Sequence, residues 1–129
     1  MIRLVIVRTT LLLTLASATL FALPALAASY PVSGAWTYDN AAGKGPAKVC
    51  GPRQMAFSGT QRHDTEGGVH DYRNISVNDT GTNTWRIVDE FYNGQIWGRV
   101  TFTLTRPDDD HIKVDMARGG ASFLLRRCE

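Results

Sequence analysis

The sequence has none of the short motifs by which an enzyme is usually recognised from a single chain. It contains no G-x-S-x-G, no H-E-x-x-H, no phosphate-binding loop and no dinucleotide-binding fingerprint. Histidine is scarce, and each of His63, His70 and His111 lies next to an aspartate. Adjacent residues of a strand point to opposite faces, so such pairs cannot bind one metal ion together. We therefore predict a non-enzymatic protein with no catalytic residues, no metal site and no cofactor.

Long apolar runs are also absent, except at the N-terminus. Arg3 and Arg8 precede an apolar segment over residues 11–26, which Pro24 interrupts and a small-residue A-x-A site ending at Ala27 closes. This layout is typical of a secretory signal peptide and predicts cleavage after Ala27. A membrane anchor is the alternative, because the stretch from Thr9 to Ala28 is about long enough to span a bilayer. The proline beside the cleavage site favours the signal peptide.

The rest of the chain has no net charge. With residues 1–27 as the signal peptide, the predicted single domain of residues 28–129 loses Arg3 and Arg8, which leaves 12 of the 14 basic residues against 12 acidic ones. A neutral domain without a basic run has no electrostatic footprint for nucleic acid or an anionic membrane. We expect neither partner after cleavage. The expected location is the periplasm or the medium, with a bacterial envelope favoured.

Cysteine is limited to Cys50 and Cys128. Two cysteines in an exported chain most simply form a disulfide, whereas a metal-binding pair would have closer spacing. In the chain-entropy model, a bond that closes so long a loop stabilises a domain by roughly 4–5 kcal/mol. We therefore predict a Cys50–Cys128 disulfide.

Helical periodicity is absent beyond residue 54, where short segments of alternating apolar and polar residues are separated by turn residues. Asn93-Gly94 predicts a two-residue turn, which would place Ile87 opposite Val100. Together with the two strands of this hairpin, 85–92 and 95–105, strands are predicted around residues 32–38, 55–57, 69–77, 111–117 and 123–125.

These segments predict an all-β domain, a small antiparallel up-and-down meander barrel of about seven to eight strands. Closure of the barrel removes both sheet edges, and a disulfide between the last strand and an early one suits that closure. A two-layer β-sandwich is the alternative arrangement of the same strands.

A short motif near the start of the predicted domain adds a resemblance. Ser33-Gly34-Ala35-Trp36, followed by antiparallel strands and a late Arg126-Arg127, resembles the calycin superfamily, and within it the lipocalins and the bacterial metalloprotease inhibitors. The resemblance implies a small β-barrel with Trp36 on its floor.

The predicted registers place one polar row on the inner face of the barrel. Arg73 falls opposite Asp89, Asp89 opposite Gly98, and Gly98 opposite Arg118. One interpretation is a ligand site, in which Gly98 leaves room and the two arginines bind a small polar or anionic molecule. The simpler interpretation is an Arg73–Asp89 pair that only stabilises the barrel.

The outer face of the same strands carries a second candidate site. Tyr72, Glu90, Tyr92 and Trp97 gather near Asn93-Gly94, and exposed aromatic residues with a charge are typical of a protein-contact patch. Two functions follow as hypotheses. The first is a binding protein for a small molecule inside the barrel, and the second is a protein-binding module in the envelope, such as an inhibitor of a periplasmic or secreted hydrolase.

Overall fold

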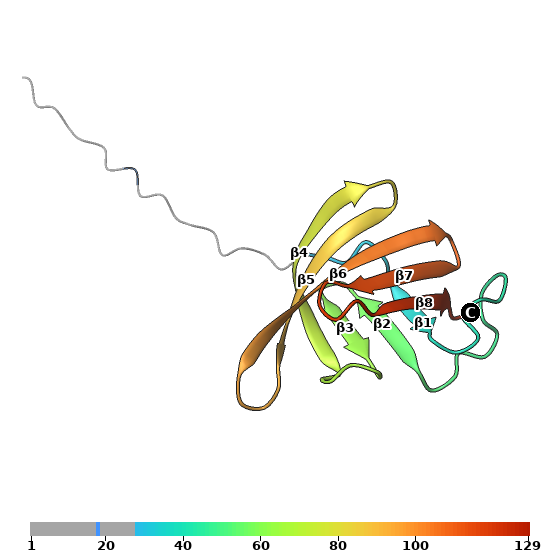
Figure 1. Cartoon of the computed structure of the whole chain (residues 1–129), viewed down its shortest axis with the longest axis horizontal. Helices are drawn as coiled ribbons and strands as arrows, with labels where there is room; N and C mark the ends of the chain where they lie inside the picture. Colours follow the sequence, from blue (N-terminus) through green and yellow to red (C-terminus); the bar gives the residue numbers. More distant parts are fainter. Residues whose placement is uncertain (1–17, 19–27) are drawn as a thin grey trace, which may run out of the picture.

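The chain forms a closed eight-stranded antiparallel barrel, seen in a computed structural model that describes residue 18 and residues 28–129 (Figure 1). The predicted signal peptide lies outside the described residues, apart from Ala18. The strands are β1 (Gly34–Thr37), β2 (Gln54–Ser58), β3 (Gln61–Asp64), β4 (Asp71–Gly81), β5 (Thr84–Tyr92), β6 (Trp97–Asp108), β7 (His111–Met116) and β8 (Ser122–Arg127). Each strand pairs with the next in sequence, and β1 also pairs with β8. The predicted up-and-down barrel is confirmed, and the sandwich alternative is wrong.

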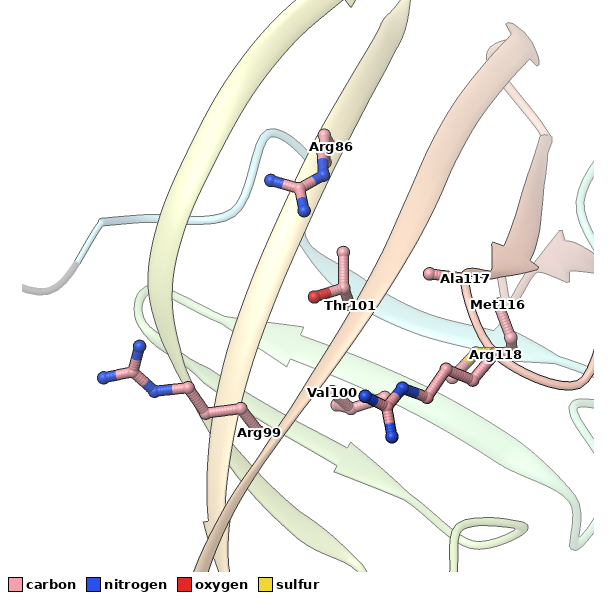
Figure 2. A pocket seen from close by; sticks show the side chains of 7 residues that line it. All are labelled: Arg86, Arg99, Val100, Thr101, Met116, Ala117 and Arg118. Carbon is pink, nitrogen blue, oxygen red and sulfur yellow. The ribbon is translucent and has the colours of Figure 1, made fainter.

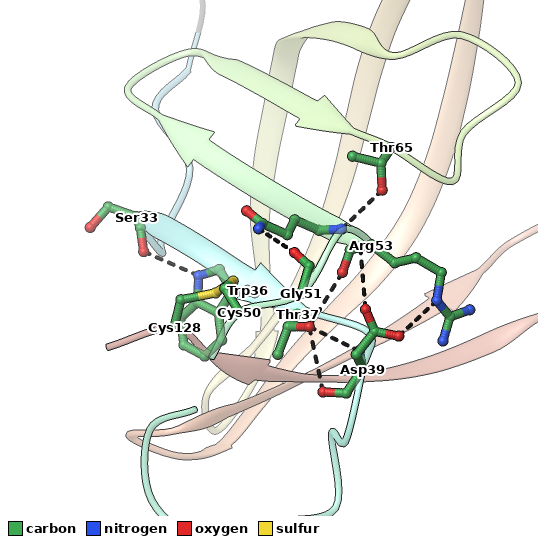
Figure 3. Close-up of a disulfide and its surroundings, with 10 residues drawn as sticks. Ser33, Trp36, Thr37, Asp39, Cys50, Gly51, Arg53, Thr65 and Cys128 are labelled. Carbon is green, nitrogen blue, oxygen red and sulfur yellow. Dashed lines mark hydrogen bonds and ion pairs between the residues drawn. A yellow bond between two sulfur atoms is a disulfide. The ribbon is translucent and has the colours of Figure 1, made fainter. Parts of the chain in front are cut away.

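The barrel closes beside the disulfide. Trp36 and Thr37 of β1 pair with Arg127 and Arg126 of β8, and the predicted bond between Cys50 and Cys128 is present (Figure 3). The bond ties the C-terminal residues to the long segment between β1 and β2. Within the described chain, no helix has the length and apolar character needed to cross a membrane.

The core fills the barrel from alternate positions of the strands, as a period of two requires. Trp36 is buried in it, and its indole N–H donates a hydrogen bond of 3.1 Å to the carbonyl of Ser33 (Figure 3). The guanidinium of Arg106 lies 5.8 Å from the Trp36 ring. The other buried apolar side chains of the core are Tyr30, Val32, Met55, Phe57, Ile87, Phe102, Leu104, Ile112, Val114 and Leu125.

The predicted turn between β5 and β6 is displaced by one residue. Ile87 pairs with Phe102 instead of Val100. The N–H of Asn93 donates a hydrogen bond of 3.1 Å to the carbonyl of Ile96, so Gly94 and Gln95 are the two central turn residues. The Oδ1 of Asn93 also accepts hydrogen bonds from the N–H groups of Gln95 and Ile96. This is an Asx turn, with Gly94 at φ 96° as its first central residue. The register moves by two residues, so the predicted faces of both strands are retained.

A β-bulge in β4 has a larger effect, because it changes the face on which residues point. Asn74 pairs with Asp89, and the next pair is Ser76 with Val88, so Ile75 is the extra residue. A one-residue insertion reverses the alternation on its N-terminal side. Arg73 therefore faces outward and Asn74 faces the interior, which corrects the predicted pairing of Arg73 with Asp89.

Candidate functional site

A cavity of about 460 Å³ opens at one end of the barrel. The loop between β3 and β4 and the apolar inner faces of β6, β7 and β8 surround it. Its lining residues are Tyr38, Arg53, Arg62, Asp64, Glu66, Gly67, Gly68, Tyr72, Val100, Phe102, Val114, Met116, Ala121 and Phe123. The cavity therefore combines an apolar wall with a small number of charged and hydroxyl groups.

Arg62 is the central polar residue of this cavity. The alternation of β3 turns Arg62 and Asp64 inward, and the Arg62 side chain is only 4% exposed. Its Nε donates a hydrogen bond of 2.7 Å to Oδ2 of Asp89, and its Nη1 donates one of 3.3 Å to Oδ2 of Asp64. The guanidinium lies 3.9 Å from the ring centroid of Tyr72 and 4.9 Å from that of Phe102. These contacts hold one planar cation between two carboxylates and two aromatic rings.

Further hydrogen bonds position the two carboxylates. Oδ1 of Asp89 accepts a bond of 3.0 Å from Nδ2 of Asn74. Oδ1 of Asp64 accepts bonds from the hydroxyl of Tyr38 at 2.9 Å and from the N–H of Glu66 at 3.0 Å. Each carboxylate oxygen thus has a donor, whereas the two bonds of Arg62 use only two of the five N–H donors that a guanidinium carries.

Three tyrosine hydroxyls around Arg62 remain protonated at neutral pH. Burial, together with the charge of Asp89, raises the pKa of Tyr30 above its ordinary value. Burial and the charge of Asp64 do the same to the pKa of Tyr38, and burial raises the pKa of Tyr72. The hydroxyl of Tyr30 is buried without a hydrogen-bond partner in the described chain. These groups are therefore hydrogen-bond donors and not anions.

The guanidinium itself is held in its charged form. Burial lowers the pKa of Arg62, but the charge and hydrogen bond of Asp89 raise it by more, and the net shift is upward. Two carboxyl groups nevertheless flank this single cation. An additional anion in the cavity would meet a site whose positive charge is already compensated.

The predicted inner row is not brought together. Asp89 is fully buried, but Arg73 lies outside and pairs with Glu90. Gly98 faces the ring of Phe91, and a Cβ at this glycine would lie 2.5 Å from Cζ of Phe91, so its missing side chain makes room for that ring and not for a ligand. Arg118 is exposed in the turn after β7. The predicted ligand site therefore shares only Asp89 with the observed polar cluster.

All four residues of the predicted outer patch line one hollow of the barrel surface, but only Tyr92 and Trp97 are strongly exposed. Tyr92 and Trp97 lie opposite each other, are 52% and 68% exposed, and have ring centroids 5.3 Å apart. Glu90 is engaged by Arg73 on the same face. The outward position predicted for Tyr72 is wrong, because the bulge in β4 turns this residue inward against Arg62.

The sequence reasoning missed Arg62 and Asp64. Their strand has polar residues at all four positions, so it offers no apolar alternation by which a strand is recognised. The signal that remained was an arginine and an aspartate two residues apart, a spacing that places both on one face of a strand. Comparison of the chain with family models, curated proteins and solved structures finds no match.

Proposed function

We propose that this protein is a non-enzymatic, exported binding protein that holds a small molecule in the cavity around Arg62. The observation that carries the proposal is a buried guanidinium on the wall of an open, otherwise largely apolar cavity. Ligand cavities in proteins commonly have volumes of about 300–1,000 Å³ and combine an apolar lining with a few oriented polar groups. The 460 Å³ cavity agrees with both criteria. The disulfide supports export, because such bonds persist in oxidising compartments.

The lining favours a ligand with an apolar body. Val100, Phe102, Val114, Met116 and Phe123 form the side of the cavity formed by β6, β7 and β8. Burial of apolar ligand surface against these residues supplies the main driving force for binding. The polar end of the ligand then lies toward the hydroxyls and charges around Arg62.

The charges favour a neutral hydrogen-bonding group at that polar end. Arg62 is compensated by Asp64 and Asp89, so the cavity has no excess positive charge for an anion. A carbonyl or hydroxyl oxygen on the ligand can accept a bond from an unused N–H of Arg62 or from a tyrosine hydroxyl. Of the polar or anionic ligands expected from the sequence, we therefore propose the uncharged polar class.

Two neighbouring residues of β8 provide a matched test. Phe123 lines the cavity and is 37% exposed, whereas Leu124 is 42% exposed and does not line it. We expect Phe123→Ala to weaken binding of the neutral fluorophore Nile red several-fold, since it removes apolar contact area, and Leu124→Ala to leave the affinity unchanged. Native mass spectrometry of the protein from its own host measures any retained ligand. Equal affinities in the two variants, with a bare wild-type protein, would contradict the proposal.

A second candidate function rests on the hairpin between β5 and β6, which projects from the barrel (Figure 1). Its tip exposes Tyr92, Ile96 and Trp97, with Ile96 64% exposed. Exposed aromatic residues on a projecting element are typical of contacts with a partner protein. Pull-down from envelope extract with wild type and Trp97→Ala tests this candidate, and identical recovery of every protein would count against it.

A further inference from the structure

Most arginines of the described chain have a partner within the protein. An exposed arginine commonly satisfies its guanidinium with a carboxylate or with backbone carbonyl groups. The engaged residues are Arg53 with Asp39, Arg62 with Asp64 and Asp89, Arg73 with Glu90, Arg106 with the carbonyls of Asp108 and Asp109, Arg126 with those of Lys44 and Gly45, and Arg127 with Asp110.

Arg86, Arg99 and Arg118 are the exceptions. Among residue 18 and residues 28–129, none of the three has a hydrogen bond or ion pair from its side chain, and all three are exposed. They line one hollow of about 520 Å³ on the outside of the barrel, together with Thr101 (Figure 2). The three unpartnered cations therefore border one hollow, around which Figure 2 shows their guanidinium groups pointing in different directions.

The end of β7 creates this hollow. Met116 pairs with Phe102 of β6, and the N–H of Ala117 donates the next hydrogen bond, of 3.0 Å, to the carbonyl of Thr101. The chain then turns away through Gly119 and Gly120, which both have a positive φ that glycine adopts without strain. From Thr101 back toward Trp97, β6 has no β7 beside it. The turn carries Arg118, whose side chain extends back toward β6 in Figure 2.

Within the part of the chain that the structure describes, no carboxylate lines the hollow. Glu90 lies opposite Arg99 in the sheet, but its carboxylate is bonded to Arg73. Asp115, one residue before Met116 on β7, accepts a hydrogen bond from Ser122 and pairs with Lys113. The three guanidinium groups therefore retain both their charge and their donors for a ligand.

We propose that Arg86, Arg99 and Arg118 form an outer binding site for a tetrahedral oxyanion, a phosphate or sulfate group. When these exposed side chains turn toward the hollow, their three guanidinium forks match a group with several acceptor oxygens, and a doubly negative charge offsets more of their mutual repulsion than a single carboxylate does. The hydroxyl of Thr101, which lies between Arg86 and Arg99 in Figure 2, offers a fourth donor. This site uses unpaired cations, whereas Arg53 and Arg62 of the interior cavity are paired with carboxylates, so it goes beyond the function proposed above.

The two sites are separable by experiment although they share a wall. Val100 and Met116 line both the outer hollow and the interior cavity, whereas the three arginines line only the outer one. Loss of Arg86, Arg99 or Arg118 therefore leaves Nile red binding in the interior unchanged. Phe123→Ala, conversely, leaves the outer site intact.

The test is a titration of the nitrogen-15-labelled protein with inorganic phosphate at constant ionic strength, with chloride as the balancing anion. We expect saturable shifts of the Nε–Hε signals of Arg86, Arg99 and Arg118. Arg99→Gln is expected to weaken phosphate binding about tenfold, because a charge-assisted hydrogen bond is lost. Lys48→Gln is the control for the loss of one surface charge, since Lys48 is exposed and lines neither the outer hollow nor the interior cavity. Unchanged thermal unfolding of both variants shows that the fold is retained.

A second arm distinguishes a free anion from a lipid headgroup. Vesicles of phosphatidylcholine with and without phosphatidic acid present the same phosphate group on a surface. Binding to the acidic vesicles that Arg99→Gln weakens assigns the site to a headgroup, and a response to inorganic phosphate alone assigns it to a soluble ligand. The absence of a saturable response in both arms, or equal phosphate affinity in wild type and Arg99→Gln, overturns the proposal.

Discussion

Arg62 and Asp89 form a buried ion pair that joins two strands on either side of β4, with 2.7 Å between Nε of Arg62 and Oδ2 of Asp89. The Asp89 side chain is fully buried and that of Arg62 nearly so. Both come from inward positions, on β3 and β5. The pair thus lies between the apolar core and the cavity, where it contributes both to the architecture and to the proposed ligand site.

Removal of one partner is expected to destabilise the barrel strongly. Arg62→Met leaves the Asp89 carboxylate buried without its cation, and we expect a loss of about 3–5 kcal/mol in the free energy of unfolding. The measurement is urea unfolding followed by tryptophan fluorescence. The double variant Arg62→Met, Asp89→Leu removes both charges and is expected to lose less than Arg62→Met alone. A single variant as stable as wild type would show that the pair is not buried in solution.

The contact between Gly98 and Phe91 predicts a second stability effect. A Cβ at Gly98 would lie 2.5 Å from Cζ and 2.8 Å from Cε2 of the Phe91 ring, so the ring must shift in Gly98→Ala. We expect a loss of about 1–3 kcal/mol, typical of overpacking. Adding Phe91→Leu removes the ring and is expected to recover part of that loss. Equal stability of Gly98→Ala and wild type in urea unfolding would contradict the observed register.

Alternation alone predicts much of this fold, because the strands from β4 to β8 have the apolar positions that a one-sided core requires. The faces of β5, β6, β7 and β8 follow from that pattern even where the turn is displaced, since a shift by two residues preserves them. The bulge at Ile75 could not be predicted from the sequence, because one extra residue does not change the composition of the strand recognisably.

The candidate site was harder to predict for the same reasons. Arg62 lies in a short strand of polar residues, and its inward position depends on pairing with β2 and β4. The outer arginines come from two strands and a turn that only the observed registers bring together. The position of the candidate site therefore depends on pairing between strands that are distant in sequence, whereas the local pattern of apolar residues determines where most of the strands lie.

The disulfide predicts a large effect of reduction. Cys50 and Cys128 are 78 residues apart in sequence, and the bond restricts the unfolded chain over that length. We expect Cys50→Ala, Cys128→Ala to lower the free energy of unfolding by about 4–5 kcal/mol in the chain-entropy model. Addition of a reductant during thermal unfolding is expected to lower the midpoint of wild type but not that of the double variant. A wild-type midpoint that is insensitive to the reductant would count against the bond.

His111 and Asp108 predict a specific dependence of stability on pH. Nδ1 of His111 lies 2.8 Å from Oδ1 of Asp108, and its Nε2 lies 2.8 Å from the carbonyl oxygen of Gly43, so the protonated ring donates to both. Partial burial lowers the pKa of His111, but the bonds to Asp108 and Gly43 raise it by more, and the net shift is upward. The hydrogen bond from His111 lowers the pKa of Asp108 below its usual range.

The signs of these two shifts define the pH window. A raised histidine pKa contributes stability that is complete below the unfolded value of about 6.5 and is lost as pH rises through the folded pKa. A lowered aspartate pKa contributes stability that is complete above about 3.9 and is lost as pH falls through the folded pKa. We therefore expect the contribution of the pair to be complete from about pH 4 to pH 6.5 and to decline on both sides.

The measurement is the free energy of unfolding of wild type and His111→Asn across this range. The difference between them is expected to be largest inside the window and to shrink as pH rises above it, because the neutral ring of wild type can donate only one of its two bonds. His63→Asn is the matched control, since His63 is exposed and contacts only the exposed carboxylate of Asp71 among the acidic residues of the described chain. A difference for His111→Asn that stays constant across the window and beyond it would mean that the link from β7 to Gly43 does not depend on protonation.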